Sequence, residues 1–119
     1  MAKTFQQLMD EARKEIREVT VQDAKELLEN NGKFVLLDVR EPYEREIALI
    51  PGSKLIPLGQ LDKRVGELDK ASPLAVHCKM GGRSARAVQF LRAQGFDAVN
   101  VAGGIHAWSQ RVDPSVPLY

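Results

Sequence analysis

The sequence predicts an α/β fold: a central parallel sheet of about five strands with helices on both faces. Short apolar runs alternate along the chain with longer segments of helical periodicity. The clearest runs are apolar at every position rather than at every second one, as expected of strands buried on both faces of a sheet. The expected strands cover residues 18–20, 34–37, 54–56, 74–78 and 98–101.

The composition is that of an ordinary globular protein of one domain. The chain has 119 residues, 44% of them hydrophobic and 28% charged, and its net charge of +1 gives no general attraction to nucleic acid or to an anionic membrane. No apolar run reaches the length of a membrane span, and Asp10 and Glu11 do not fit a signal peptide. The single cysteine, Cys78, excludes an intrachain disulfide and a multi-cysteine metal site. We therefore expect a cytoplasmic protein.

Residues 1–17 are expected to form an N-terminal extension and residues 18–119 the domain itself. Apolar residues recur at helical spacing over residues 5–16, which predicts an amphipathic helix with Thr4 and Gln7 as a capping box. Most helices of this kind pack on their own domain. A partner-binding helix and the remnant of a linker are the alternatives.

Residues 20–68 supply several element boundaries. Thr20 and Asp23 form a capping pattern for a short helix that ends at residues 30–32. Asp38 closes the strand over 34–37, and Pro42 suits the first turn of a short helix. A broken helical pattern covers residues 58–68, where two glycines weaken it. Asp38 is either a turn carboxylate or the partner of Arg40 in a pair that braces the loop around Cys78.

The strand over 74–78 ends in Cys78, and a helical pattern runs from Ser84 to Gln94 with Gly95 as its stop signal. Gly81 and Gly82 allow the tight loop between them. Such a loop directs backbone N–H groups into one hollow at the positive end of the helix, where a thiolate is stabilised. A free cysteine has a pKa of about 8.5, so reactivity near neutral pH needs this help. The alternative is that Cys78 is a small buried hydrophobe.

Three segments are expected to meet at one edge of the sheet. Asp38, Cys78 and Gly103–Gly104 all follow strands, and ligands of such folds bind beyond the carboxyl ends of parallel strands. A last helix covers about residues 105–112, with Trp108 as a packing residue. His77 is expected to point away from the site and to have a structural role rather than to act as a general base, because side chains alternate along a strand.

Four motifs in this order resemble a rhodanese-type sulfurtransferase domain over residues 18–119. They are Leu37–Pro42 with Glu44, Ile50–Ser53 with Ile56–Leu58, His77–Ser84, and Gly95–Phe96 followed by Gly103–Ile105 and Ala107–Trp108. The sequence departs from the family at Ala48 and Leu49, where a Gly-His pair is usual. Residues 46–52 and 112–119 are similar to the rhodanese domain fused behind E1-like adenylating enzymes of molybdopterin and thiamine biosynthesis.

The resemblance implies a persulfide relay in which Cys78 is the catalytic nucleophile. The implied substrate-binding residues are Lys79, Met80, Gly81, Gly82, Arg83 and Ser84. Lys79 and Arg83 would attract an anionic donor such as thiosulfate and favour the thiolate, while Asp38 and Arg40 would support the loop. A cysteine desulfurase or a sulfur-carrier protein is the implied partner, and no metal or organic cofactor is needed.

Two other functions are compatible with the motif. A cysteine phosphatase also uses a cysteine–arginine loop, but its arginine lies six positions after the cysteine, whereas Arg83 lies five after Cys78. Some rhodanese-like domains are thought to act as docking or regulatory modules, and those commonly lack the cysteine.

Overall fold

The computed structural model describes residues 4, 7 and 17–119. Its centre is a five-stranded, all-parallel sheet with the strand order β1-β5-β4-β2-β3. The strands are β1 (Glu18–Val19), β2 (Val35–Asp38), β3 (Lys54–Leu55), β4 (Leu74–His77) and β5 (Ala98–Val101). The predicted α/β architecture and all five predicted strands are confirmed. No helix in the described part of the chain is long and apolar enough to cross a membrane.

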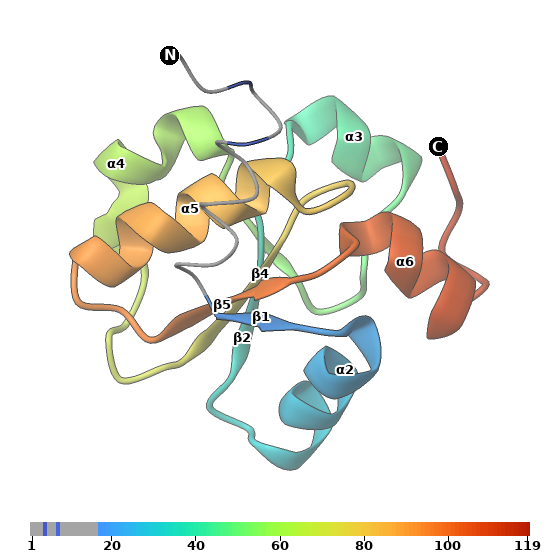
Figure 1. The fold of residues 1–119 in the computed structure, drawn as a ribbon, viewed down its shortest axis with the longest axis horizontal. Coiled ribbons are helices and arrows are strands. Elements are labelled where there is room, and N and C mark those ends of the chain that lie inside the picture. The colour runs from blue at the N-terminus through green and yellow to red at the C-terminus, as the bar shows by residue number, and fades with distance from the viewer. Residues whose placement is uncertain (1–3, 5–6, 8–16) are drawn as a thin grey trace.

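The helices cover both faces of this sheet (Figure 1). One side carries α4 (Leu61–Arg64) and α5 (Gly82–Ala93), and the other carries α2 (Val21–Asn30) and α6 (Gly104–Arg111). The short helix α3 (Pro42–Ile47) follows β2, and the 3₁₀ turns η1 (Leu58–Gln60) and η2 (Val65–Glu67) flank α4. The broken pattern predicted over residues 58–68 corresponds to this series of short turns.

Strand alternation divides the core into two layers. Leu74 and Val76 of β4 pack with α5, whereas Ala75 packs with α2 and α6. Trp108 belongs to the second layer at 7% exposure, which confirms its packing role. Cys78 continues the α5 side, so His77 faces the other way, as predicted. The His77 side chain is fully buried, and burial lowers its pKa.

Both predicted capping patterns are confirmed, but one helix begins earlier than predicted. The Thr20 hydroxyl accepts a hydrogen bond from the Asp23 amide at the start of α2, and Thr4 and Gln7 exchange the two capping-box bonds. The helix predicted over residues 5–16 lies outside the described residues. The α5 helix begins at Gly82, two residues before the predicted start at Ser84. Gly81 adopts a left-handed conformation (φ = 111°) at the N-cap, so the chain turns into the helix earlier.

Candidate active site

The sulfur of Cys78 lies at the N-terminus of α5, where two groups donate hydrogen bonds to it. The Gly81 amide lies 3.1 Å from Sγ and the Ser84 hydroxyl 3.4 Å. The first helical hydrogen bond runs from the Ala85 amide to the Gly81 carbonyl, so the amides of Gly82, Arg83 and Ser84 precede it and have no acceptor in the helix. This arrangement suits a thiolate or an anion attached to the sulfur.

Both interpretations of Cys78 apply in part. The residue is only 2% exposed and belongs to the apolar cluster beneath α5, which fits a small buried hydrophobe. Its sulfur nevertheless accepts two hydrogen bonds, which a residue buried only for packing does not need. Within the same loop the sulfur is thus almost fully covered, whereas the side chain of Met80, two residues later, is exposed.

The loop over residues 78–81 is fixed to the start of α6. The amides of Ile105 and His106 donate to the carbonyls of Cys78 and Lys79 at 2.9 and 3.1 Å. The predicted meeting of the Cys78 loop with Gly103–Gly104 at one sheet edge is thus confirmed. These two bonds fix the path of the loop, whose Gly81 amide donates to the sulfur.

Gly104 makes this close approach possible, and we expect Gly104→Ala to be strongly destabilising. A Cβ atom at residue 104 would lie 2.5 Å from the carbonyl oxygens of both Cys78 and Lys79, and its φ of +56° is already left-handed. We expect a loss of about 2–4 kcal/mol in the free energy of unfolding, measured by urea denaturation. Gly52→Ala is the matched control, because φ is +84° there but the space is open, and it should cost only about 1 kcal/mol. Equal losses in the two variants would contradict the close-contact argument.

Asp38 and Arg40 form a fully buried ion pair beside this loop. Both carboxylate oxygens of Asp38 accept from the Arg40 side chain, at 2.7 and 2.9 Å, and one also accepts from the Arg40 amide at 3.0 Å. Asp38 is therefore at once the turn carboxylate and the ion-pair partner that the sequence left as alternatives. Burial alone would raise the pKa of Asp38, but the hydrogen bonds from Arg40 hold it below its usual value.

The remaining N–H groups of Arg40 extend a network toward the Cys78 loop. They donate to the carbonyls of Glu44 and Ala48 and to the Tyr119 hydroxyl. With the two bonds to Asp38, all five side-chain donors of Arg40 have an acceptor, which explains how a buried guanidinium is tolerated.

Arg83 is held by a carboxylate on α3. Its two terminal nitrogens donate to the two oxygens of Glu44 at 2.7 and 2.8 Å. Glu44 also accepts from the Glu41 amide, within the capping box of α3, and from the Tyr119 hydroxyl. The positive charge of Arg83 is therefore matched at short range, and Lys79 is the predicted loop cation without a carboxylate partner among the described residues.

The Glu44–Arg83 pair is expected to make stability depend on pH. The hydrogen bonds from Arg83 lower the pKa of Glu44 to about 2, from 4.5. The unfolded chain then binds more protons than the folded one at low pH, so the stabilisation is complete above about pH 4.5 and is lost as the pH falls toward 2. Arg83→Gln should make the free energy of unfolding less dependent on pH over this range. We expect its slope against pH to fall by up to about 1.4 kcal/mol per pH unit. Arg86→Gln, on the exposed side of α5, is the control and should keep the wild-type slope.

Sequence reasoning did not assign roles to Glu44 and Tyr119. Glu44 was part of one of the motifs, but nothing in that motif indicated that its carboxylate pairs with Arg83. Tyr119 lies 75 residues from Glu44 in the chain, and no local pattern connects the two. A separate cavity of about 550 Å³ lies between α2 and α6, lined by residues such as Leu28, Phe34 and Trp108, and none of the predicted site residues lines it.

Comparison with known proteins agrees with this geometry. The family model described as a rhodanese-like domain matches residues 20–111. The chain belongs to the rhodanese-like domain family. A crystal structure of a rhodanese-related protein from Thermoplasma volcanium superposes with a TM-score of 0.75 at 38% identity, covering 87% of this chain and 99% of that one.

Three relatives show how this rhodanese-like domain occurs in larger and smaller proteins. "Rhodanese-like/PpiC domain-containing protein 12, chloroplastic" of Arabidopsis thaliana is 47% identical over 89 residues, covering 71% of this chain and 30% of that protein. "Adenylyltransferase and sulfurtransferase MOCS3-2" of Zea mays is 38% identical over 109 residues, covering 85% and 23%. "Putative sulfurtransferase YtwF" of Bacillus subtilis is 35% identical over 100 residues, covering 84% and 97%.

The chain thus spans less than a third of the first two of these relatives and nearly all of the third. The predicted similarity to rhodanese domains fused to adenylating enzymes is confirmed by the second relative. Two of the three have sulfurtransferase in their names, which supports sulfur transfer as the general class of activity.

Proposed function

We propose that the protein is a sulfurtransferase that carries a sulfane sulfur as a persulfide on Cys78. The observation that carries the proposal is the position of Sγ at the N-terminus of α5, 3.1 Å from the Gly81 amide. A sulfur that must ionise, attack and then hold a second, negatively charged sulfur needs this kind of donor environment.

The proposed cycle has two displacements at sulfur. The Cys78 thiolate attacks the outer sulfur of thiosulfate, the sulfur–sulfur bond of the donor breaks, and sulfite leaves with the electron pair. The outer sulfur of the resulting persulfide carries the negative charge. The amides of residues 82–84 have no acceptor in the helix and are the donors proposed to stabilise it. A thiolate acceptor, or cyanide in an assay, then attacks the outer sulfur and restores the Cys78 thiolate. Cys78 is the only carrier that this cycle requires.

Intact-mass spectrometry tests the proposal directly. Incubation with thiosulfate, or with a low-molecular-weight persulfide, is expected to add about 32 Da, the mass of one sulfur atom, and dithiothreitol should remove it. Cys78→Ala is the control and should show no gain. A gain that persists in this variant, or no gain with either donor, would count against the relay. The second of these results would favour a docking or regulatory module, for which the low exposure of Cys78 is the supporting observation.

A phosphatase activity is less well supported. Both terminal nitrogens of Arg83 donate to Glu44, so a phosphate bound at the Cys78 loop would have to compete with this carboxylate for the arginine. The spacing of five from Cys78 to Arg83 also favours the smaller cradle. An aryl phosphate should therefore remain unhydrolysed under conditions in which sulfur is transferred.

The surroundings of the Cys78 loop support a protein as one of the sulfur partners. The large apolar side chains that are exposed in the described residues lie on α3 and the segment after it, on the Cys78 loop and on the C-terminal segment: Tyr43, Ile47, Leu49, Met80 and Leu118. Apolar exposure gathered on a few segments is typical of an interaction surface. We propose a cysteine desulfurase or a sulfur-carrier protein as this partner, alongside thiosulfate as a small donor. A reducing compartment such as the cytoplasm would keep the lone thiol active.

A further inference from the structure

The C-terminal segment places an aromatic ring against the active loop. The Lys79 ammonium nitrogen lies 4.6 Å from the centroid of the Tyr119 ring, within the range of a cation–π interaction. Arg83 shares its charge with Glu44, so Lys79 is the loop cation that remains to attract an anion. Both Lys79 and Tyr119 are half-buried, so the contact is partly shielded from water.

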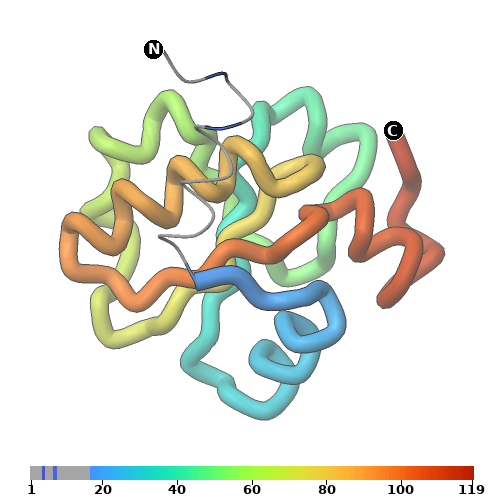
Figure 2. The backbone as a smooth tube through the Cα atoms, viewed as in Figure 1, coloured from blue at the N-terminus to red at the C-terminus, as the bar shows by residue number. Residues whose placement is uncertain are grey.

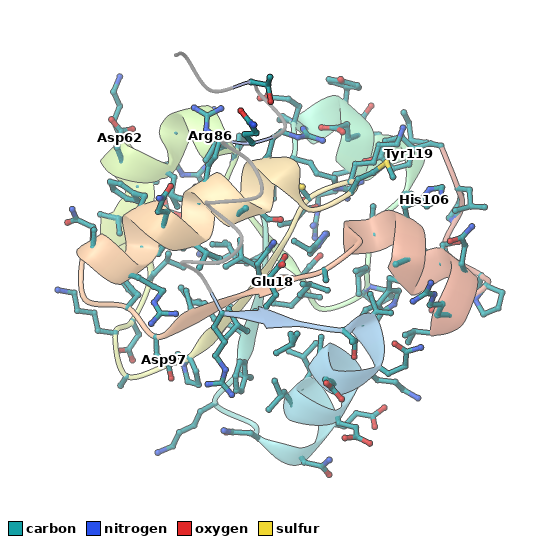
Figure 3. The ribbon with its side chains drawn as sticks, in the orientation of Figure 1. Glu18, Asp62, Arg86, Asp97, His106 and Tyr119 are labelled. Carbon is teal, nitrogen blue, oxygen red and sulfur yellow. The ribbon has the colours of Figure 1, made fainter. Side chains whose placement is uncertain are left out.

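The ring of Tyr119 is held from two directions. Its hydroxyl accepts a hydrogen bond from Arg40 at 2.8 Å and donates one to Glu44 at 3.1 Å. Three residues earlier, Val116 is buried in the core layer of α2 and α6, and its carbonyl accepts a hydrogen bond from the Ser109 hydroxyl. The C-terminal segment therefore returns beside α3 and the Cys78 loop (Figure 2). Figure 3 shows Tyr119 at this end of the molecule, near His106 of α6 and far from Asp97 before β5.

We propose that Tyr119 is a positioning residue whose ring holds the Lys79 ammonium at the mouth of the Cys78 loop and so gives the site its preference for anionic sulfur donors. This inference rests on the proposed sulfur transfer for its biological meaning, but the charge placement itself does not depend on turnover. A lysine side chain is long and flexible. Without the ring, its ammonium group would sample many positions in solvent, where salt screens its charge.

The test compares alkylation of Cys78 by iodoacetate, which is anionic, and by iodoacetamide, which is neutral. The ratio of the two rate constants reports the local potential at the sulfur, because the thiolate fraction is common to both reagents. At low ionic strength, Lys79→Gln and Tyr119→Leu are each expected to lower this ratio about three- to ten-fold. Tyr119→Phe keeps the ring and should retain more than half of the wild-type ratio. The differences should disappear near 1 M salt, where the screening length is about 3 Å.

Two substitutions serve as matched controls. Tyr43→Leu makes the same change at a tyrosine that is 65% exposed, and Lys33→Gln removes one positive charge near the amino end of β2. Both should leave the ratio unchanged. The proposal is overturned if Tyr119→Leu leaves the ratio at the wild-type value, or if Tyr119→Phe lowers it as much as Tyr119→Leu does.

Turnover gives a second, independent readout. With thiosulfate as donor, Tyr119→Leu and Lys79→Gln should raise KM by a factor similar to the change in the alkylation ratio, with kcat within about two-fold of wild type. A fall in kcat at unchanged KM would contradict a role in donor attraction. Alkylation needs no sulfur donor, so failure of the persulfide test would not be confused with failure of this inference.

Discussion

Replacing Cys78 with serine or with alanine is expected to abolish sulfur transfer from thiosulfate to cyanide, by at least about a thousand-fold in kcat/KM. A serine hydroxyl is not ionised near neutral pH and forms no persulfide, and alanine offers no nucleophile at all. The loss should be of the same size in both variants. The measurement is the rate of thiocyanate formation, with circular dichroism to confirm that the variants are folded.

Serine is the informative replacement because it can keep the local hydrogen bonds. Its oxygen can accept from the Gly81 amide, as the sulfur does, so the loop should hold its shape. Arg86→Gln changes an exposed side chain of α5 outside the loop, and it should retain most of the turnover. Residual activity in Cys78→Ser above a few percent of wild type would mean that the cysteine is not the carrier.

Neutralising the buried carboxylate of Asp38 is expected to have the largest effect on stability. Asp38→Asn should lower the free energy of unfolding by about 3–5 kcal/mol, because it leaves the guanidinium of Arg40 buried without its counter-charge. The side chain keeps its size and can still accept from the Arg40 amide, so the cost reflects the lost charge rather than a cavity. Urea denaturation at pH 7 measures the change.

Glu67→Gln is the matched control for this prediction. Glu67 forms a similarly short ion pair with Arg64, at 2.6 Å, but about two fifths of its side chain is exposed. Water and salt screen such a pair, so its neutralisation should leave the unfolding midpoint within experimental error. If the two substitutions changed the midpoint equally, the buried pair would not be the main support of this edge of the sheet.

The sequence was informative where local chemistry decides structure. The apolar runs of β2 and β4 identified central strands, and the parallel topology that they imply brought Asp38, Cys78 and Gly104 to one edge. The loop between Cys78 and Ser84 was predicted from its glycines and from the helix that follows.

The sequence was less informative where distant segments meet. The pairing of Glu44 with Arg83 depends on where α3 lies relative to α5, and the place of Tyr119 depends on the path of the C-terminal segment over α6. Neither contact has a periodicity or a motif that would show it. The earlier start of α5 arose because Gly81, rather than a side chain, forms the N-cap.

Asn100, the last residue but one of β5, links the active loop to the first strand. Its amide nitrogen donates both to the Gly81 carbonyl, at 3.2 Å, and to the Glu18 carboxylate, at 2.8 Å. Glu18 and Tyr119 lie outside residues 20–111, the part that the family model matches. Trimming the gene to those borders would therefore delete a contact on each side of the loop. The Arg17 carbonyl also accepts from the Asn100 amide, so the smallest version worth engineering into a fusion or a sensor extends from Arg17 to Tyr119.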